Sequence, residues 1–152
     1  MKKRILFVCL GNICRSPMAE GIMNKLVRDR GLSDKVEVDA AGTAAYHVGE
    51  RADPRTRALL SHHDSEFTTR ARQVADEDFT RFDLILAMDA SNLRGLEQRC
   101  PPEHAHKLHK ALEPLGGGDV GDPYYGGADG FEQNYQELSE ALEIWLERLL
   151  AL

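Results

Sequence analysis

The sequence predicts an α/β fold, a three-layer sandwich in which a four-stranded parallel sheet has helices on both faces. Two observations support this class. Short apolar runs alternate along the chain with longer segments of helical periodicity. The first run, residues 4–8, is apolar at every position after Arg4, as expected for a central parallel strand. A chain of 152 residues suits one domain, and we expect residues 1–152 to form it.

The first helix is expected to begin at Ser16 and Pro17. Serine is a preferred N-cap, and proline fits the first helical position. Apolar residues at helical spacing follow, and Gly31 is a stop signal. Three further strands are expected at residues 36–40, 83–88 and 107–112, the last being the weakest pattern.

The remaining helices are expected at residues 54–62, in a short form within residues 71–82, and directly after Asp89, which can cap the helix that follows it. Residues 116–130 contain too many glycines for a regular element and are expected to be a loop. Asp129 with Glu132 resembles a capping box. The final helix is predicted by an apolar stripe of period three to four, formed by Phe131, Tyr135, Leu138, Leu142, Trp145 and Leu149.

Composition excludes several classes of partner. The net charge is −6 and the pI about 5.5, so the chain lacks the basic field of a general nucleic-acid or anionic-membrane surface. The basic start resembles a secretory signal, but its apolar stretch ends at Leu10 without a cleavage site. Three cysteines do not make a disulfide framework. We therefore expect a cytoplasmic protein that binds neither nucleic acid nor membrane.

The segment "CLGNICRS" links the first strand to the first helix, where ligands bind in open α/β sheets. Backbone N–H groups that lead into a helix start form an anion site. Gly11 lets the loop curl, and the planar fork of Arg15 suits two phosphate oxygens. The expected phosphate-binding residues are Leu10, Gly11, Asn12, Ile13, Cys14, Arg15 and Ser16.

Cys9 lies at the centre of this loop and is the candidate nucleophile. A helix N-terminus and a nearby cation favour the thiolate form of a cysteine. A thiolate beneath a bound phosphate monoester can attack phosphorus, and no metal or other cofactor is required if Arg15 and the N–H groups stabilise the charge. Asp122, in a loop before two tyrosines, is the candidate acid for the leaving oxygen. Tyr124 and Tyr125 could flank a planar ring.

These residues also allow other interpretations. A Walker-type nucleotide loop needs Lys followed by Ser or Thr, which this segment lacks. Cys9 could be a small buried hydrophobe, and so could Cys14. Cys100 is interpreted as incidental. The histidines of "HAHKLH" have neither zinc-finger nor helical-pair spacing, and we expect no metal site there.

Four segments together resemble the low-molecular-weight protein tyrosine phosphatases over essentially the whole chain: "CLGNICRSP", "AGT", "MDASNL" and "DPYY". The resemblance implies that Cys9 is the nucleophile, Arg15 the phosphate clamp and Asp122 the general acid. It implies that Asn12 and Ser16 support the loop. It also places Tyr46 on the pocket wall with Tyr124 and Tyr125 opposite, and makes Cys14 a reversible disulfide partner of Cys9 under peroxide.

The chain departs from the family pattern at two positions. The family often has Ser and His where this chain has Ala40 and Thr69, and both substitutions touch the network that holds the loop asparagine. Related arsenate reductases use additional cysteines after the third strand, which this chain lacks. Related arginine phosphatases carry Thr where this chain has Ile13, and an apolar side chain suits an aryl phosphate better.

The sequence therefore predicts metal-independent hydrolysis of phosphotyrosine and other aryl phosphates through a cysteinyl-phosphate intermediate. The expected partners are a phosphotyrosine-containing protein as substrate and inorganic phosphate as product or inhibitor, and we expect a monomer. The alternative from another class is a phosphate-binding or redox-sensing module without catalysis.

Overall fold

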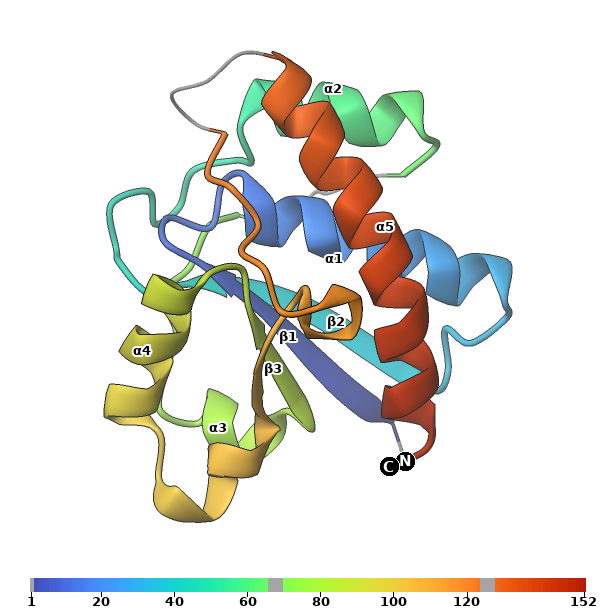
Figure 1. Ribbon diagram of the computed structural model, residues 1–152. Helices are drawn as coiled ribbons and strands as arrows, with labels where there is room; N and C mark the ends of the chain where they lie inside the picture. The colour runs from blue at the N-terminus through green and yellow to red at the C-terminus, as the bar shows by residue number, and fades with distance from the viewer. Residues whose placement is uncertain (1, 66–69, 124–127) are drawn as a thin grey trace.

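Four parallel strands form the sheet, in the spatial order β2-β1-β3-β4 (Figure 1). They are β1 (Lys3–Cys9), β2 (Val36–Gly42), β3 (Leu84–Ala87) and β4 (Leu108–Lys110). The computed structural model describes residues 2–65, 70–123 and 128–152. Because all neighbouring strands run parallel, their carboxyl ends meet at one edge of the sheet. The predicted four-stranded parallel sheet is confirmed.

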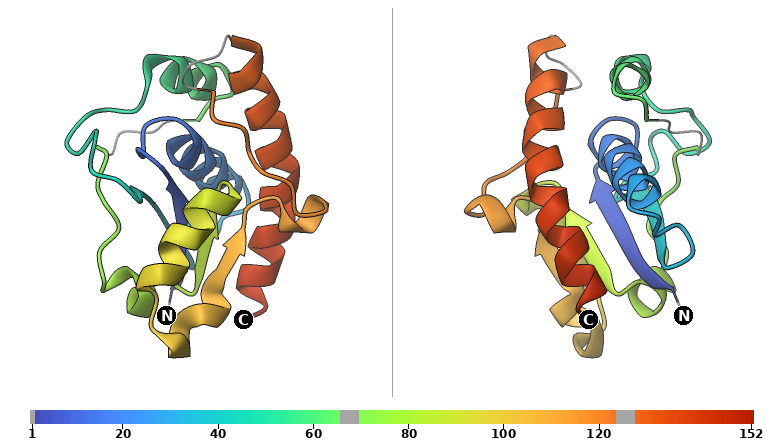
Figure 2. Two further views of the ribbon diagram at one scale, coloured as in Figure 1. Left: turned by 60° about the vertical axis from the view of Figure 1, so that its left-hand side comes forward. Right: turned by 90° about the vertical axis from the view of Figure 1, so that its right-hand side faces the viewer.

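Helices cover both faces of the sheet, as the sequence predicts (Figure 2). They are α1 (Arg15–Asp29), α2 (Pro54–His62), α3 (Asp78–Arg81), α4 (Ala90–Arg99) and α5 (Ala128–Leu150), with short 3-10 helices at Pro102–Lys107 and Glu113–Leu115. One face of the sheet packs on α1 and α5, and the opposite face on α3 and α4. Helix α2 packs on the outside of α1 and α5.

Strand β1 supplies both cores because successive side chains alternate between the two faces. Ile5 and Phe7 face the core built with α1 and α5, whereas Leu6 and Val8 face the core built with α3 and α4. All four are fully buried, and burial of such a side chain contributes about 1.5–3 kcal/mol. Strand β1 is apolar on both faces because it lies in the interior of the sheet, with a core on each side.

Two predicted helix starts are wrong. Helix α1 begins at Arg15 with Cys14 as its N-cap residue, so Ser16 lies inside the helix rather than capping it. Its hydroxyl is engaged instead by the preceding loop. Asp129 likewise lies inside α5, which begins at Ala128, so the predicted capping box is not formed as proposed. The error at Ser16 arose because a short polar side chain can also find partners outside the helix start.

The other predicted elements are confirmed with small shifts in their ends. Helix α2 has the predicted bounds, and Asp89 caps α4 by accepting a hydrogen bond from Asn92 N at 2.7 Å. Strand β2 continues beyond the predicted Ala40 to Gly42, which pairs with Cys9. Within the described parts of the chain, no helix is long and apolar enough to cross a membrane.

Candidate active site

A tight loop, residues 9–16, leads from the end of β1 into α1 and is called the 9–16 loop below. Asn12 has a φ of +56°, in the left-handed region, where asparagine is tolerated better than most residues. This conformation turns the backbone N–H of Asn12 toward Cys9 Sγ, at 3.2 Å. The sulfur thus accepts a main-chain hydrogen bond from its own loop.

Two buried side chains brace the loop from beneath. Ser16 Oγ donates to Asn12 Oδ1 at 2.8 Å and lies 3.0 Å from Cys9 Sγ. Asn12 Nδ2 donates to the carbonyl oxygen of Ala40 at 3.4 Å. At position 40 the main-chain carbonyl therefore accepts the hydrogen bond from Asn12, which the methyl side chain of alanine cannot do. Thr69, the other departure from the family pattern, lies outside the described residues.

Arg15 is 2% exposed, and its guanidinium is held by Asp89 and by the main chain of Val120. NH1 donates to Asp89 Oδ2 at 2.6 Å and to the carbonyl oxygen of Val120 at 3.0 Å, while NH2 lies 3.6 Å from Asp122 Oδ2. Burial alone would lower the pKa of Arg15, but Cys9, Asp89 and Asp122 outweigh it, and the pKa is raised. Arg15 is therefore a permanent cation beside the sulfur.

These groups open into one pocket of about 120 Å³, lined by Cys9, Leu10, Gly11, Ile13, Cys14, Arg15, Tyr46, His47 and Asp122. The structure thus brings the predicted sulfur, cation and carboxylate together, although more than 100 residues separate Arg15 from Asp122. Tyr46 is 75% exposed on the pocket wall. Asn12 and Ser16, predicted among the phosphate-binding residues, are fully buried and lie behind the lining. Tyr124 and Tyr125 lie outside the described residues.

Cys14 borders the same pocket but has a different environment from Cys9. Burial raises the pKa of the Cys14 thiol to about 12, and the negative charge of Asp53 adds to the effect. Asp53 itself is bound by Arg55, whose side chain and backbone hydrogen bonds lower the pKa of the Asp53 carboxyl. Cys14 is thus a neutral thiol at physiological pH.

A sequence model of the family described as low molecular weight phosphotyrosine protein phosphatase matches residues 4–151. The chain belongs to this family. It is 48% identical over 139 residues to the low molecular weight protein-tyrosine-phosphatase of Streptomyces coelicolor, covering 88% of this chain and 85% of the relative. The fold and enzyme class expected from the sequence are confirmed, and the chain is a protein-tyrosine phosphatase.

Solved structures agree with the family assignment. The chain resembles the protein tyrosine phosphatase of Entamoeba histolytica with a TM-score of 0.91 and 40% identity, covering 97% of this chain and 98% of the other. It also resembles an arginine phosphatase of Drosophila, with a TM-score of 0.89 and 36% identity, covering 97% of this chain. The low molecular weight phosphatase fold therefore extends over nearly the entire chain.

The site roles of two residues were missed in the sequence: His47, which lines the pocket, and Asp89, which holds Arg15. His47 lies against Gly11, where an added Cβ would come within 2.8 Å of His47 Cδ2, and its Nδ1 lies 2.9 Å from Glu50 Oε2. Its position directly after Tyr46 was the available signal. Asp89 was assigned only a capping role, although the end of β3 lies beside the end of β1 in a parallel sheet.

Proposed function

We propose that this pocket hydrolyses phosphotyrosine in two steps, with Cys9 as the nucleophile. In the first step Cys9 Sγ forms a bond to phosphorus while the bond from phosphorus to the phenolic oxygen breaks, and Asp122 gives that oxygen its proton. In the second step a water molecule attacks phosphorus, the Asp122 carboxylate accepts a proton from the water, and the bond between sulfur and phosphorus breaks. Inorganic phosphate leaves, and the thiolate is restored.

Charge that develops on the phosphoryl oxygens is matched by Arg15 and by the N–H groups of the 9–16 loop. Asp89 and Val120 hold the guanidinium through NH1, and NH2 lies 3.6 Å from Asp122 Oδ2 at the pocket. With substrate bound, the fork formed by Nε and NH2 takes two oxygens of the phosphoryl group. Preorganised donors of this kind stabilise the transition state without having to reorient during the reaction. The single observation that carries the proposal is that Cys9, Arg15 and Asp122 line one pocket.

The walls of the pocket favour an aryl phosphate on a protein substrate. Leu10 is 43% exposed and Tyr46 75% exposed, so both present apolar surface at the entrance, and Ile13 lines the interior. An aromatic ring can pack on such walls, whereas the guanidinium of phosphoarginine would have to lose its hydration against Ile13. We therefore assign phosphotyrosine rather than phosphoarginine as the substrate. We further propose that the enzyme works in the reducing cytoplasm, where the free cysteines persist.

Cys14 is proposed as the partner that protects Cys9 from oxidation. Peroxide converts the Cys9 thiolate to a sulfenic acid, the Cys14 sulfur then attacks Cys9 Sγ, and the hydroxyl group leaves as water. Both sulfurs border the same pocket, and a negative charge on Cys9 contributes to the raised pKa of Cys14, which supports their proximity.

The test is hydrolysis of p-nitrophenyl phosphate and of a phosphotyrosine peptide in the presence of a chelator. Wild-type protein should turn over both substrates, and Cys9→Ser should turn over neither while still binding inorganic phosphate in a calorimeter. A phosphoarginine peptide should be a poor substrate by comparison. Turnover by Cys9→Ser would refute the nucleophile assignment, and faster hydrolysis of phosphoarginine would refute the substrate assignment.

A further inference from the structure

Beneath the 9–16 loop, the end of strand β2 acts as a support. The carbonyl of Ala40 accepts the hydrogen bond from Asn12 Nδ2, and the carbonyl of Ala41 lies 3.4 Å from Ser16 Oγ. Both distances are close to the limit at which a hydrogen bond still contributes. The position of these two carbonyls therefore affects how Asn12 and Ser16 are oriented, in addition to the hydrogen bond between the two side chains.

Arg72 holds the chain on both sides of these two residues. Its NH2 donates to Asp39 Oδ2 at 3.1 Å, directly before Ala40, and Asp39 Oδ1 accepts from the Ala40 N–H at 2.8 Å. The carbonyl oxygen of Arg72 accepts a hydrogen bond from the N–H of Gly42 at 2.8 Å, and Gly42 directly follows Ala41. One residue from outside the sheet thus fixes β2 immediately before and immediately after the two supporting carbonyls.

The guanidinium of Arg72 is itself rigidly placed. It meets Asp78 at the start of α3 in a two-pronged contact, NH1 to Oδ2 at 2.9 Å and NH2 to Oδ1 at 3.1 Å, and Asp78 Oδ2 also accepts from Ala75 N at 2.8 Å. Only 4% of the Asp78 side chain is exposed. Paired, partly buried contacts of this geometry hold a side chain far better than an exposed ion pair does.

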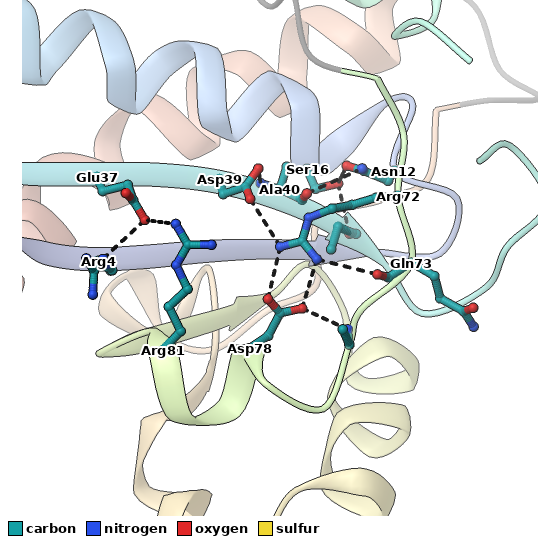
Figure 3. Close-up of polar contacts among 12 residues, drawn as sticks. Arg4, Asn12, Ser16, Glu37, Asp39, Ala40, Arg72, Gln73, Asp78 and Arg81 are labelled. Atoms are coloured by element: carbon teal, nitrogen blue, oxygen red, sulfur yellow. Dashed lines mark hydrogen bonds and ion pairs between the residues drawn. The ribbon is translucent and has the colours of Figure 1, made fainter. Parts of the chain in front are cut away.

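We propose that Arg72 is a positioning residue for the active site, an inference that rests on the proposed function. It holds the end of β2 against α3, so that the carbonyls of Ala40 and Ala41 keep Asn12 and Ser16 oriented toward Cys9 Sγ. Figure 3 shows this arrangement, with Arg72 between Asp39 and Asp78 and the side chains of Asn12 and Ser16 beyond Ala40. Arg72 does not line the pocket and acts only through the strand.

The same strand offers a matched control. Arg81 donates from NH2 to Glu37 Oε2 at 2.8 Å, so it also ties α3 to β2 through a carboxylate, but two residues before Asp39 (Figure 3). Arg81 is 51% exposed, and the interactions described for it do not reach the supporting carbonyls. Arg72→Met and Arg81→Met each remove a side-chain link between β2 and α3, the first partly buried and the second exposed, and only the first should disturb the site.

The experiment measures kcat and KM for p-nitrophenyl phosphate, inhibition by inorganic phosphate and the thermal unfolding temperature of both variants. Arg72→Met should lower kcat roughly tenfold and weaken phosphate inhibition, because a small misplacement of the reacting groups is costly. Arg81→Met should change neither. If Arg72→Met lowers only the unfolding temperature, with kcat and phosphate inhibition as in the wild type, the proposal is overturned.

A second measurement tests the route through Asn12. Asn12→Ala removes the side chain that rests on Ala40, so Arg72→Met added to it should cost much less than in the wild type. Equal effects in both backgrounds would refute the route. If Arg72→Met does not fold, Asp39→Asn replaces it, since asparagine keeps the acceptor for Ala40 N–H but loses the charge; unchanged kcat and phosphate affinity in that variant would overturn the proposal.

Failure of the proposed function would look different from failure of this inference. Turnover that survives in Cys9→Ser would refute the chemistry while leaving the role of Arg72 testable. In that case phosphate affinity is measured by calorimetry, which does not depend on turnover. Weaker phosphate binding in Arg72→Met than in Arg81→Met would support the positioning role, and equal binding in the two variants would overturn it.

Discussion

Asp89 binds Arg15 through one carboxylate oxygen and caps helix α4 through the other. Oδ2 lies 2.6 Å from Arg15 NH1, and Oδ1 accepts from Asn92 N at 2.7 Å. A single side chain therefore connects the cation of the pocket to the start of a helix on the opposite face of the sheet. The orientation of Arg15 depends on a residue that follows a different strand.

Asp89→Asn and Asp89→Ala should separate these two roles. Asparagine keeps an oxygen for the cap but not the charge, whereas alanine loses both. Both variants should lower kcat/KM for p-nitrophenyl phosphate by roughly tenfold or more, because a cation that is out of place no longer matches the phosphoryl oxygens. Only alanine should lose a further ~1 kcal/mol of stability through the missing cap.

Steady-state kinetics and urea unfolding check this pair of variants. Wild-type kcat/KM in Asp89→Asn would mean that the charge of Asp89 is not needed to orient the guanidinium. Equal stability of the two variants would mean that the cap contributes nothing measurable to the fold.

Asp122→Ala should lower the rate most for substrates with poor leaving groups. The proposed role of Asp122 is to protonate the leaving oxygen, and a good leaving group needs little protonation. We expect a loss of about 10²-fold or more for phosphotyrosine, with a smaller loss for p-nitrophenyl phosphate. The measurement is kcat across a series of aryl phosphates of graded leaving-group pKa. A uniform loss across the series would show that Asp122 is not the acid.

Closure of a disulfide between Cys9 and Cys14 should accelerate steadily with pH. The attacking sulfur must be a thiolate, and burial holds the pKa of Cys14 at about 12. The reactive fraction of Cys14 therefore rises about tenfold for each pH unit between pH 7 and 10. Peroxide treatment followed by mass spectrometry, which detects the loss of two hydrogens, measures the rate, with Cys100→Ser as the control that should behave like the wild type. A rate independent of pH would contradict the assignment of Cys14.

Gly42→Ala should damage both stability and activity. A Cβ at this position would lie 2.8 Å from the carbonyl oxygen of Leu10 and 3.2 Å from the carbonyl carbon of Gly11, which are main-chain atoms and cannot move aside cheaply. We expect a loss of about 1–3 kcal/mol of stability, together with a lower kcat because the 9–16 loop is displaced.

Gly95→Ala provides the control for this change. A Cβ there would meet the nearest atom, in the side chain of Thr43, at 3.6 Å, an ordinary contact inside α4. Alanine in a helix interior should leave activity intact and raise stability by about 0.5–1 kcal/mol. If the two variants prove equally stable, the close approach at Gly42 is not a constraint on the loop.

Sequence reasoning succeeded where the signal was local. The apolar runs placed the strands, and the segment from Cys9 to Arg15 placed a sulfur and a cation on one short loop. The parallel order of the sheet then explains how Asp122 reaches them, since the segments that follow all four strands begin at the same edge of the sheet. These predictions needed only strand polarity and residue chemistry.

The errors arose where a polar side chain had more than one partner within reach. Serine is a residue type that often caps helices, but the hydroxyl of Ser16 lies between Asn12 and Cys9 instead. The capping role of Asp89 was predictable because it acts within four residues, whereas its contact with Arg15 spans 74 positions. Long-range pairing of this kind leaves no periodic pattern in the sequence.

The acceptor for Asn12 Nδ2 is a peptide oxygen, which every amino acid at position 40 possesses. Small residues that fit the buried space at position 40 should therefore leave catalysis intact, because they change the side chain and Asn12 binds the main-chain oxygen. In a saturation library selected for turnover, position 40 would then be limited by volume alone, and the neighbouring Asp39 by charge and geometry. Substitutions at Asp39 should therefore harm this enzyme more than substitutions at Ala40, although Asn12 is bound to the main chain of Ala40.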